Sequence, residues 1–132
     1  LYLNGGTLNI NAKNEESTEG SIYVTSYIHY NGTSITGVGN ISRRYKVKNQ
    51  SVIFVSFIEL QKKGTTLYIK DKKGKTIQKI KSKYDYYYCV FSSPKLKENE
   101  KYYLYVDKKK IIEIIPRNNM IMIDSDGRLF GR

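Results

Sequence analysis

Cysteine, histidine, tryptophan and long apolar runs are the rarest features of this sequence. The 132 residues include one cysteine, one histidine, two prolines and no tryptophan. A lone cysteine excludes an internal disulfide, and a cysteine-based zinc site needs two to four cysteines at short spacing. No apolar run approaches the ~18 residues of a membrane span. We therefore expect a soluble chain that has neither a disulfide nor a membrane-spanning segment.

Side chains that could perform catalysis are equally few. Cys89 and His29 could in principle act as nucleophile and base, but no local motif supports the pair. A buried cysteine within a strand is ordinarily inert packing. Glycoside hydrolysis needs two carboxylates ~5 to ~10 Å apart, and the scattered acids select no such pair. The sequence therefore predicts a protein that is not an enzyme.

The length predicts one domain with a single hydrophobic core. The chain begins at Leu1, without a basic and apolar leader before it, which predicts a processed or excised segment. The net charge of +11 is uneven: residues 1–42 carry −2, residues 43–110 carry +13 and residues 111–132 carry 0. Such a basic block can attract acidic polymers, or it can be the solvated face of a lysine-rich domain.

Short β-branched and aromatic segments dominate, and no segment shows the spacing of an amphipathic helix. An all-β fold follows from this pattern. Alternation and turn residues predict strands at residues 7–12, 21–25, 33–36, 51–60, 66–70, 76–81, 86–92, 101–107 and 111–115. A hairpin is expected near Asp71 to Gly74, because glycine accepts positive φ. Residues 93–100 should form a turn-rich crossing after Pro94.

Several segments together resemble one family. Residues 6–15 (GTLNINAKNE) and 20–25 (GSIYVT) are similar to rungs of the carbohydrate-binding parallel β-helix domain of surface and secreted proteins from anaerobic Gram-positive bacteria. Residues 51–55, 64–77 and 91–106 resemble the C-terminal module of the same family. The resemblance implies the last rungs of a right-handed parallel β-helix followed by a small antiparallel β cap or sandwich.

The resemblance also implies a division of the chain and a location. Residues 1–48 would be the terminal β-helix rungs, residues 49–110 the antiparallel cap module packed on them, and residues 111–132 a C-terminal edge strand and tail. Only two or three rungs fit, so the chain would be the end of a longer domain or a shortened relative. The protein would be extracellular or attached to the cell surface.

The resemblance implies calcium in the acidic turns of the rungs. Here the matching turn contains the oxygen-bearing residues Asn14, Glu15, Glu16 and Glu19. Calcium takes six to eight oxygen ligands, so these residues could form part of a site; a solvated polar turn is the other interpretation. Residues 124–127 (DSDG) similarly allow a calcium loop or a plain Asp-Gly turn.

The tyrosines and the basic block predict the ligand. Tyrosine rings offer stacking platforms for sugar faces, and arginine suits carboxylate recognition. The predicted carbohydrate-binding residues are Tyr23, Tyr27, Tyr30, Arg43, Arg44, Tyr45 and Lys46. Together with the resemblance, which implies carbohydrate binding outside the cell, they predict a non-catalytic carbohydrate-binding module for an extracellular acidic polysaccharide, either a polyuronate or a cell-wall polymer.

Two other functions remain open. Lysines interleaved with aromatics around Tyr84, Tyr86, Tyr87 and Tyr88 would also suit a basic β-barrel that binds single-stranded nucleic acid. The acidic segment rich in Gly, Thr and Asn at residues 1–42 argues against that barrel. A structural cap or interaction module without a ligand is the third interpretation. The sequence does not determine the oligomeric state.

Overall fold

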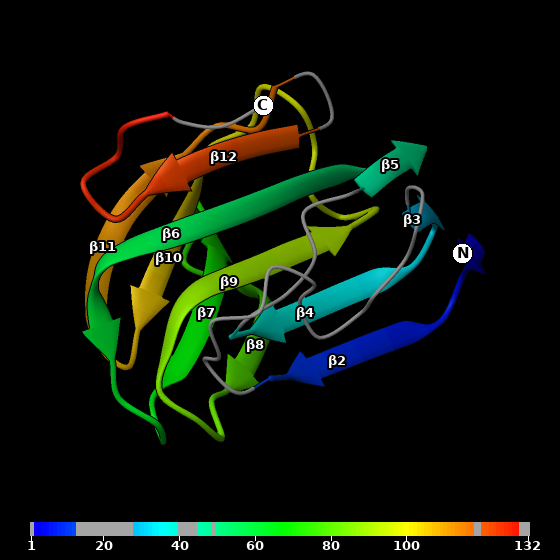
Figure 1. The fold of residues 1–132 in the computed structure, drawn as a ribbon. Helices are drawn as coiled ribbons and strands as arrows, with labels where there is room; N and C mark the ends of the chain where they lie inside the picture. The colour runs from blue at the N-terminus through cyan, green and yellow to red at the C-terminus, as the bar shows by residue number, and fades with distance from the viewer. Residues whose placement is uncertain (1, 13–27, 40–44, 49, 118–119, 130–132) are drawn as a thin grey trace.

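The computed structural model describes residues 2–12, 28–39, 45–48, 50–117 and 120–129, and this part of the chain is built from strands (Figure 1). The predicted all-β fold is thus confirmed. Among the described residues no helix is long and apolar enough to span a membrane. The twelve strands are β1 Tyr2–Asn4, β2 Thr7–Asn11, β3 Ile28–Asn31, β4 Ser34–Val38, β5 Tyr45–Lys48, β6 Ser51–Gln61, β7 Thr66–Asp71, β8 Thr76–Lys81, β9 Tyr86–Ser93, β10 Tyr102–Val106, β11 Lys109–Ile114 and β12 Met120–Asp124.

These strands form three open sheets. A small parallel sheet has the order β1-β3-β5, a four-stranded antiparallel sheet has the order β11-β10-β7-β8, and a mixed five-stranded sheet has the order β12-β6-β9-β4-β2. β9 lies between β4 and β6 and is antiparallel to both. The outer strands β12 and β2 pair in parallel with β6 and β4. The pairing of β12 with β6 and the pairing of β4 with β9 each join strands that are far apart in sequence.

The parallel pairing of β2 with β4 agrees with the parallel strands predicted there, whereas the described residues do not show a β-helix coil. Thr7 of β2 lies opposite Ser34 of β4, and the register holds to the ends of both strands. β1 and β3 pair in parallel as well. The turns that join β1 to β2 and β3 to β4 are stacked, because the Gly5 N–H donates to the Asn31 carbonyl at 2.9 Å. The predicted strand at residues 21–25 lies outside the described residues.

The hairpin predicted near Asp71 to Gly74 is present. β7 and β8 form a hairpin whose turn is closed by the Asp71 N–H, which donates to the Lys75 carbonyl at 2.9 Å. Gly74 has a φ of 85°, as such a turn requires. β11 is an edge strand, as expected for the segment before Pro116. β6 and β9, which belong to the predicted cap, share a sheet with β2 and β4, which belong to the predicted rungs. The boundary between rungs and cap near residue 48 therefore stays a prediction.

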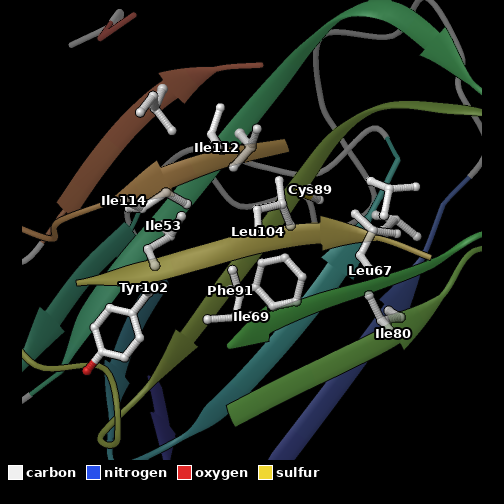
Figure 2. Close-up of a cluster of buried hydrophobic side chains, with 14 of the residues drawn as sticks. Ile53, Leu67, Ile69, Ile80, Cys89, Phe91, Tyr102, Leu104, Ile112 and Ile114 are labelled. Atoms are coloured by element: carbon white, nitrogen blue, oxygen red, sulfur yellow. The ribbon is translucent and has the colours of Figure 1, made fainter. Parts of the chain in front are cut away.

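The main core lies between the four-stranded and five-stranded sheets. Figure 2 shows its side chains, including Ile53, Phe91 and Cys89 from one sheet and Leu67, Ile69 and Leu104 from the other. The opposite face of the five-stranded sheet holds a second cluster of Ile35, Val52, Phe54 and Val90. β6 is therefore buried on both faces over residues 52–55, which explains its continuous apolar run.

Candidate functional site

The structure describes few of the carbohydrate-binding residues predicted from the sequence. Tyr30 lies on β3, while Tyr45 and Lys46 lie on β5, where Tyr45 is in register with Ile28 and Lys46 with His29. For these three residues the backbone alone is described. The residues that lie outside the described part of the chain are Tyr23, Tyr27, Arg43 and Arg44, together with the predicted calcium ligands Asn14, Glu15, Glu16 and Glu19.

A different group of tyrosines and lysines comes together on the outer face of the four-stranded sheet. Alternation along β7 and β10 sends Leu67, Ile69 and Leu104 into the core. The intervening side chains face away from the core and are half-buried or exposed. We call this surface the Tyr–Lys face; its members are Tyr68, Lys70, Lys79, Tyr103, Tyr105 and Lys110.

The register of the sheet brings these residues into rows across the strands. Tyr105 lies opposite Tyr68 and also opposite Lys110, and Tyr68 lies opposite Lys79. One row therefore reads lysine, tyrosine, tyrosine, lysine across all four strands. The neighbouring row places Tyr103 opposite Lys70. Cross-strand neighbours of this kind have Cβ atoms ≈ 4.5–5.5 Å apart, so their side chains lie side by side.

Two ammonium groups of this face, those of Lys70 and Lys110, lie over tyrosine rings. The Lys70 Nζ is 4.5 Å from the ring centroid of Tyr105 and 5.4 Å from that of Tyr68. The Lys110 Nζ is 4.6 Å from the ring centroid of Tyr103. Lysine within ~6 Å of a ring centroid is attracted to the electron-rich ring face. The rings thus hold positive charges in place at a surface that water can reach.

Carboxylates balance little of this charge. Glu113 lies on the same sheet opposite Tyr103, and its Oε1 is 3.5 Å from the Nζ of Lys101. This ion pair is about half exposed at both side chains, so it contributes only ~0 to ~1 kcal/mol. The lysines of the Tyr–Lys face themselves make no ion pair with any described residue. The face is accordingly a basic and aromatic surface.

The other chemically interesting residues have structural surroundings. Cys89 is fully buried in the main core, and this burial raises the pKa of its thiol far above the ordinary value. Asp124 accepts the N–H groups of Asp126 and Arg128 at 2.9 Å each, so residues 124–127 form a plain turn. These bonds, that from Arg128 foremost, lower the pKa of the Asp124 carboxyl. Within the described residues no three acids, cysteines or histidines cluster as metal ligands would.

Tyr86 and Tyr87, the first two residues of β9, differ in burial as the alternation of a strand predicts. Tyr86 is fully buried, and its hydroxyl lies 2.9 Å from the Thr65 Oγ1. Tyr87 is 36% exposed, whereas Tyr88 is half-buried against Phe54. The strand register is irregular between Ser56 and Gln61 on the partner β6. These tyrosines therefore do not line a continuous groove of the kind a nucleic-acid barrel would need.

No protein-family model matches this chain, and neither the curated proteins nor the solved structures include a significantly similar one. The resemblance to the carbohydrate-binding β-helix family thus stays a prediction from residue patterns. The Tyr–Lys face was missing from the predicted site, although alternation placed tyrosines of β7 and β10 on one side. What the sequence could not show is that these two strands, more than 30 residues apart, are neighbours.

Proposed function

We propose that this chain is a non-catalytic module that binds an acidic polysaccharide along the Tyr–Lys face. The observation that supports it most is the placement of the Lys70 ammonium over the rings of Tyr68 and Tyr105. A uronate carboxylate drawn to Lys70 would bring its sugar ring against the two tyrosine rings. Aromatic faces offer apolar contact area and a polar hydroxyl at the rim.

The polymer must supply the affinity through repetition. Each exposed contact between ions contributes only ~0 to ~1 kcal/mol, because water and salt screen it. A row of lysine, tyrosine, tyrosine and lysine presents several such contacts to successive units of one chain. Linked contacts raise the overall affinity far above that of any single one. Binding should therefore be measurable for a long polyuronate and undetectable for a monosaccharide.

We further propose that the parallel strands are the last rungs of a right-handed parallel β-helix and that residues 49–110 are its cap. The stacked turns support this: the Ser34 N–H donates to the Gly6 carbonyl at 2.9 Å, and the Thr33 hydroxyl donates to the Gly5 carbonyl at 3.0 Å. Under this proposal Tyr30, Tyr45 and Lys46 would extend the polymer path. Calcium at residues 14–19 and an extracellular location belong to the same proposal.

Affinity electrophoresis tests the binding site. Gels containing polygalacturonate or a neutral glucan would be run with the parent chain, with Tyr68→Ala plus Tyr105→Ala, and with Lys70→Gln. Both variants should lose retardation in the acidic gel, by at least about tenfold in apparent Kd. Tyr87→Ala and Lys95→Ala are matched controls, since both residues are exposed and lie outside the face. Retardation of the face variants equal to that of the parent would contradict the assigned site.

The same gels test the residues predicted from the sequence. Arg43→Ala with Arg44→Ala should weaken retardation further if the polymer also contacts the segment before β5. Full retardation of this variant, together with loss in the Tyr68 and Tyr105 variant, would confine binding to the Tyr–Lys face. Melting temperatures of all variants establish that lost retardation reflects lost contacts and not unfolding.

Single-stranded nucleic acid is the second candidate, because bases also stack on aromatic rings in basic surroundings. The aromatic Tyr–Lys face of a four-stranded sheet is the observation that favours it. Phosphate contacts make nucleic-acid affinity fall steeply with salt, with a slope near −0.7 per phosphate for single strands. Fluorescence titrations with a labelled oligothymidine and a labelled polyuronate, across a range of salt, decide between the two. Tighter binding of the oligothymidine at physiological salt would favour nucleic acid.

A further inference from the structure

A pocket of about 910 Å³ is lined by residues from the end of β6 and the start of β11. These two strand ends lie on the same side of the molecule (Figure 1). Its walls come from the last residues of β6, from the turn between β10 and β11, and from the turn after β12. Pockets of ~300 to ~1,000 Å³ are large enough for a ligand. This groove lies at the edge of the four-stranded sheet and is separate from the centre of the Tyr–Lys face, although Lys110 touches both.

Backbone without a paired strand among the described residues lines the groove, and on the β6 side the Ile58 N–H donates to the Ser125 Oγ at 3.0 Å. Residues 57–60 of β6 have no register partner in β9 or β12, among the strands that the structure describes. Within the described part of the chain β11 pairs with β10 alone, which leaves its other edge open there. Open strand edges carry unpaired N–H and C=O groups that accept an additional strand. The end of β6 and β11 are not hydrogen-bonded neighbours, and the groove occupies the space between them.

The groove combines apolar side chains with charges of both signs: its wall holds the lysines Lys108, Lys109 and Lys110 and the acids Glu59, Asp107 and Asp126. Ile58 is 51% exposed in its wall, and Ile111 lines the facing side. Lys108 and Lys109 are exposed in the wall and form no ion pair with the described residues. Two of the three acids are engaged within the fold, which leaves Glu59 facing three lysines. Asp107 accepts the Thr66 N–H at 3.0 Å, and Asp126 pairs with Arg128 at 3.1 Å.

We infer that this groove binds an extended acidic peptide, which adds a strand to the open edge of β11. The peptide would place apolar side chains on Ile58 and Ile111, while its carboxylates would face Lys108 and Lys109. Strand addition supplies affinity through backbone hydrogen bonds and specificity through alternate side chains. A second copy of this chain is disfavoured as occupant, because two molecules of net charge +11 repel each other.

Fluorescence anisotropy tests the inference with a labelled short peptide of alternating glutamate and valine. The parent chain should bind it, whereas Lys108→Ala with Lys109→Ala should weaken binding at least about tenfold, as should Ile58→Asp. Lys72→Ala with Lys73→Ala is the matched control, because it removes two exposed lysines from the other hairpin turn. Leu129→Asp is the matched control for Ile58→Asp, since Leu129 is 71% exposed outside the groove.

Three further comparisons make the result decisive. The same peptide with alternate backbone nitrogens methylated should lose binding, because strand addition needs those N–H groups. Tyr68→Ala with Tyr105→Ala should leave peptide binding unchanged, which separates the groove from the polysaccharide proposal. No binding by the parent, equal loss in the Lys72 and Lys73 control, or full binding of the methylated peptide would each overturn the inference. So would a dimer of the parent in sedimentation that Ile58→Asp abolishes, because a second copy would then occupy the groove.

Discussion

Gln50 uses its side-chain amide to join segments that are far apart in sequence. The amide accepts the Thr33 N–H at 3.1 Å, donates to the Thr33 carbonyl at 2.8 Å and donates to the Ser92 Oγ at 2.7 Å. Ser92 in turn donates to the Ser51 carbonyl at 2.8 Å. Since all four residues are buried, these bonds replace contacts with water. Gln50 thereby fixes the turn between β3 and β4 against the start of β6.

Gln50→Ala should therefore lower the free energy of unfolding by roughly 2–4 kcal/mol, because the Thr33 N–H and carbonyl lose their partners without gaining water. Urea denaturation followed by tyrosine fluorescence measures the change. Gln61→Ala is the matched control: its side chain donates to the exposed Glu59 carbonyl at 3.0 Å, and its loss should cost less than about 0.5 kcal/mol. Similar losses in the two variants would show that the Gln50 bonds do not hold the turn.

The buried thiol of Cys89 makes stability depend on pH in the alkaline range. In the unfolded chain a cysteine loses its proton near pH ~8.5, whereas burial raises the pKa of Cys89 far above that value in the folded chain. Above pH ~8.5 the folded state therefore holds more protons than the unfolded state, and stability falls as the pH rises. The contribution of Cys89 is fully present below that pH.

Between pH ~8.5 and ~10 the free energy of unfolding should fall by roughly 2 kcal/mol more in the parent than in Cys89→Ala. Urea denaturation at each pH measures both proteins, and the comparison removes the contribution of lysines. Burial raises the pKa of Tyr86 as well, so a further decline is expected above pH ~10 in both proteins. Parallel pH profiles from ~8.5 to ~10 would mean that the thiol ionises within the folded protein.

At the scale of strands and turns, Gly39 has the tightest constraint. Its φ is 102°, and a Cβ there would lie 2.0 Å from the carbonyl oxygen of Ala12. Its N–H donates to the Tyr88 carbonyl at 2.8 Å, which ties the end of β4 to β9. The contact with Ala12 is between backbone atoms, so a side chain could be accommodated only by separating β2 from β4.

Gly39→Ala should consequently destabilise the chain by more than about 3 kcal/mol, whereas Gly74→Ala should cost only about 1–2 kcal/mol. Gly74 also has a positive φ, of 85°, but a Cβ there would meet nothing within 4 Å. Comparing the two variants thus separates the energetic cost of a positive φ, which both share, from the cost of steric overlap, which only Gly39→Ala has. Thermal unfolding by circular dichroism measures both. A cost at Gly39 no greater than that at Gly74 would show that β2 can move away from β4 easily.

Local signals predicted most of the strands, since alternation and turn residues act over a few positions. The hairpin turn shows this: Asp71 accepts the N–H groups of Lys73 and Lys75 at 2.9 Å each. The turn at Asp124 repeats the same bonds with Asp126 and Arg128. The same sequence pattern, Asp-x-x-Gly followed by a basic residue, therefore forms the same type of turn at both places.

Pairings between distant segments could not be predicted in this way. Nothing local indicates that β9 inserts between β4 and β6 or that β12 pairs in parallel with β6, because the side chains of many strands satisfy the same apolar pattern. The Tyr–Lys face depends on one such pairing, between β7 and β10. The predicted cluster around Arg43 and Tyr45 rested on adjacency in sequence, which is why it missed residues that only the sheet brings together.

Across the whole molecule, positive charge is the dominant electrostatic feature. The net charge is +11, and the described residues form ion pairs at only two sites, Lys101 with Glu113 and Arg128 with Asp124 and Asp126. Repulsion among unpaired lysines on one compact body opposes folding, because the unfolded chain spreads the same charges apart. Salt screens such repulsion over distances beyond the Debye length of ≈ 10 Å at 0.1 M.

Sodium chloride should therefore have opposite effects on stability and on binding. Raising it from about 0.01 M to 0.5 M should increase the melting temperature by roughly 3 °C, while polyuronate retardation should weaken as its ionic contacts are screened. Lys72→Glu with Lys95→Glu changes the net charge by −4, from +11 to +7, at two exposed positions outside the Tyr–Lys face. This variant should melt higher at low salt and respond less to added salt. A melting temperature that falls with salt would mean that attraction within the ion pairs outweighs repulsion among the lysines. The basic surface would then be balanced by contacts within the fold itself, and less of its charge would be left for an acidic ligand.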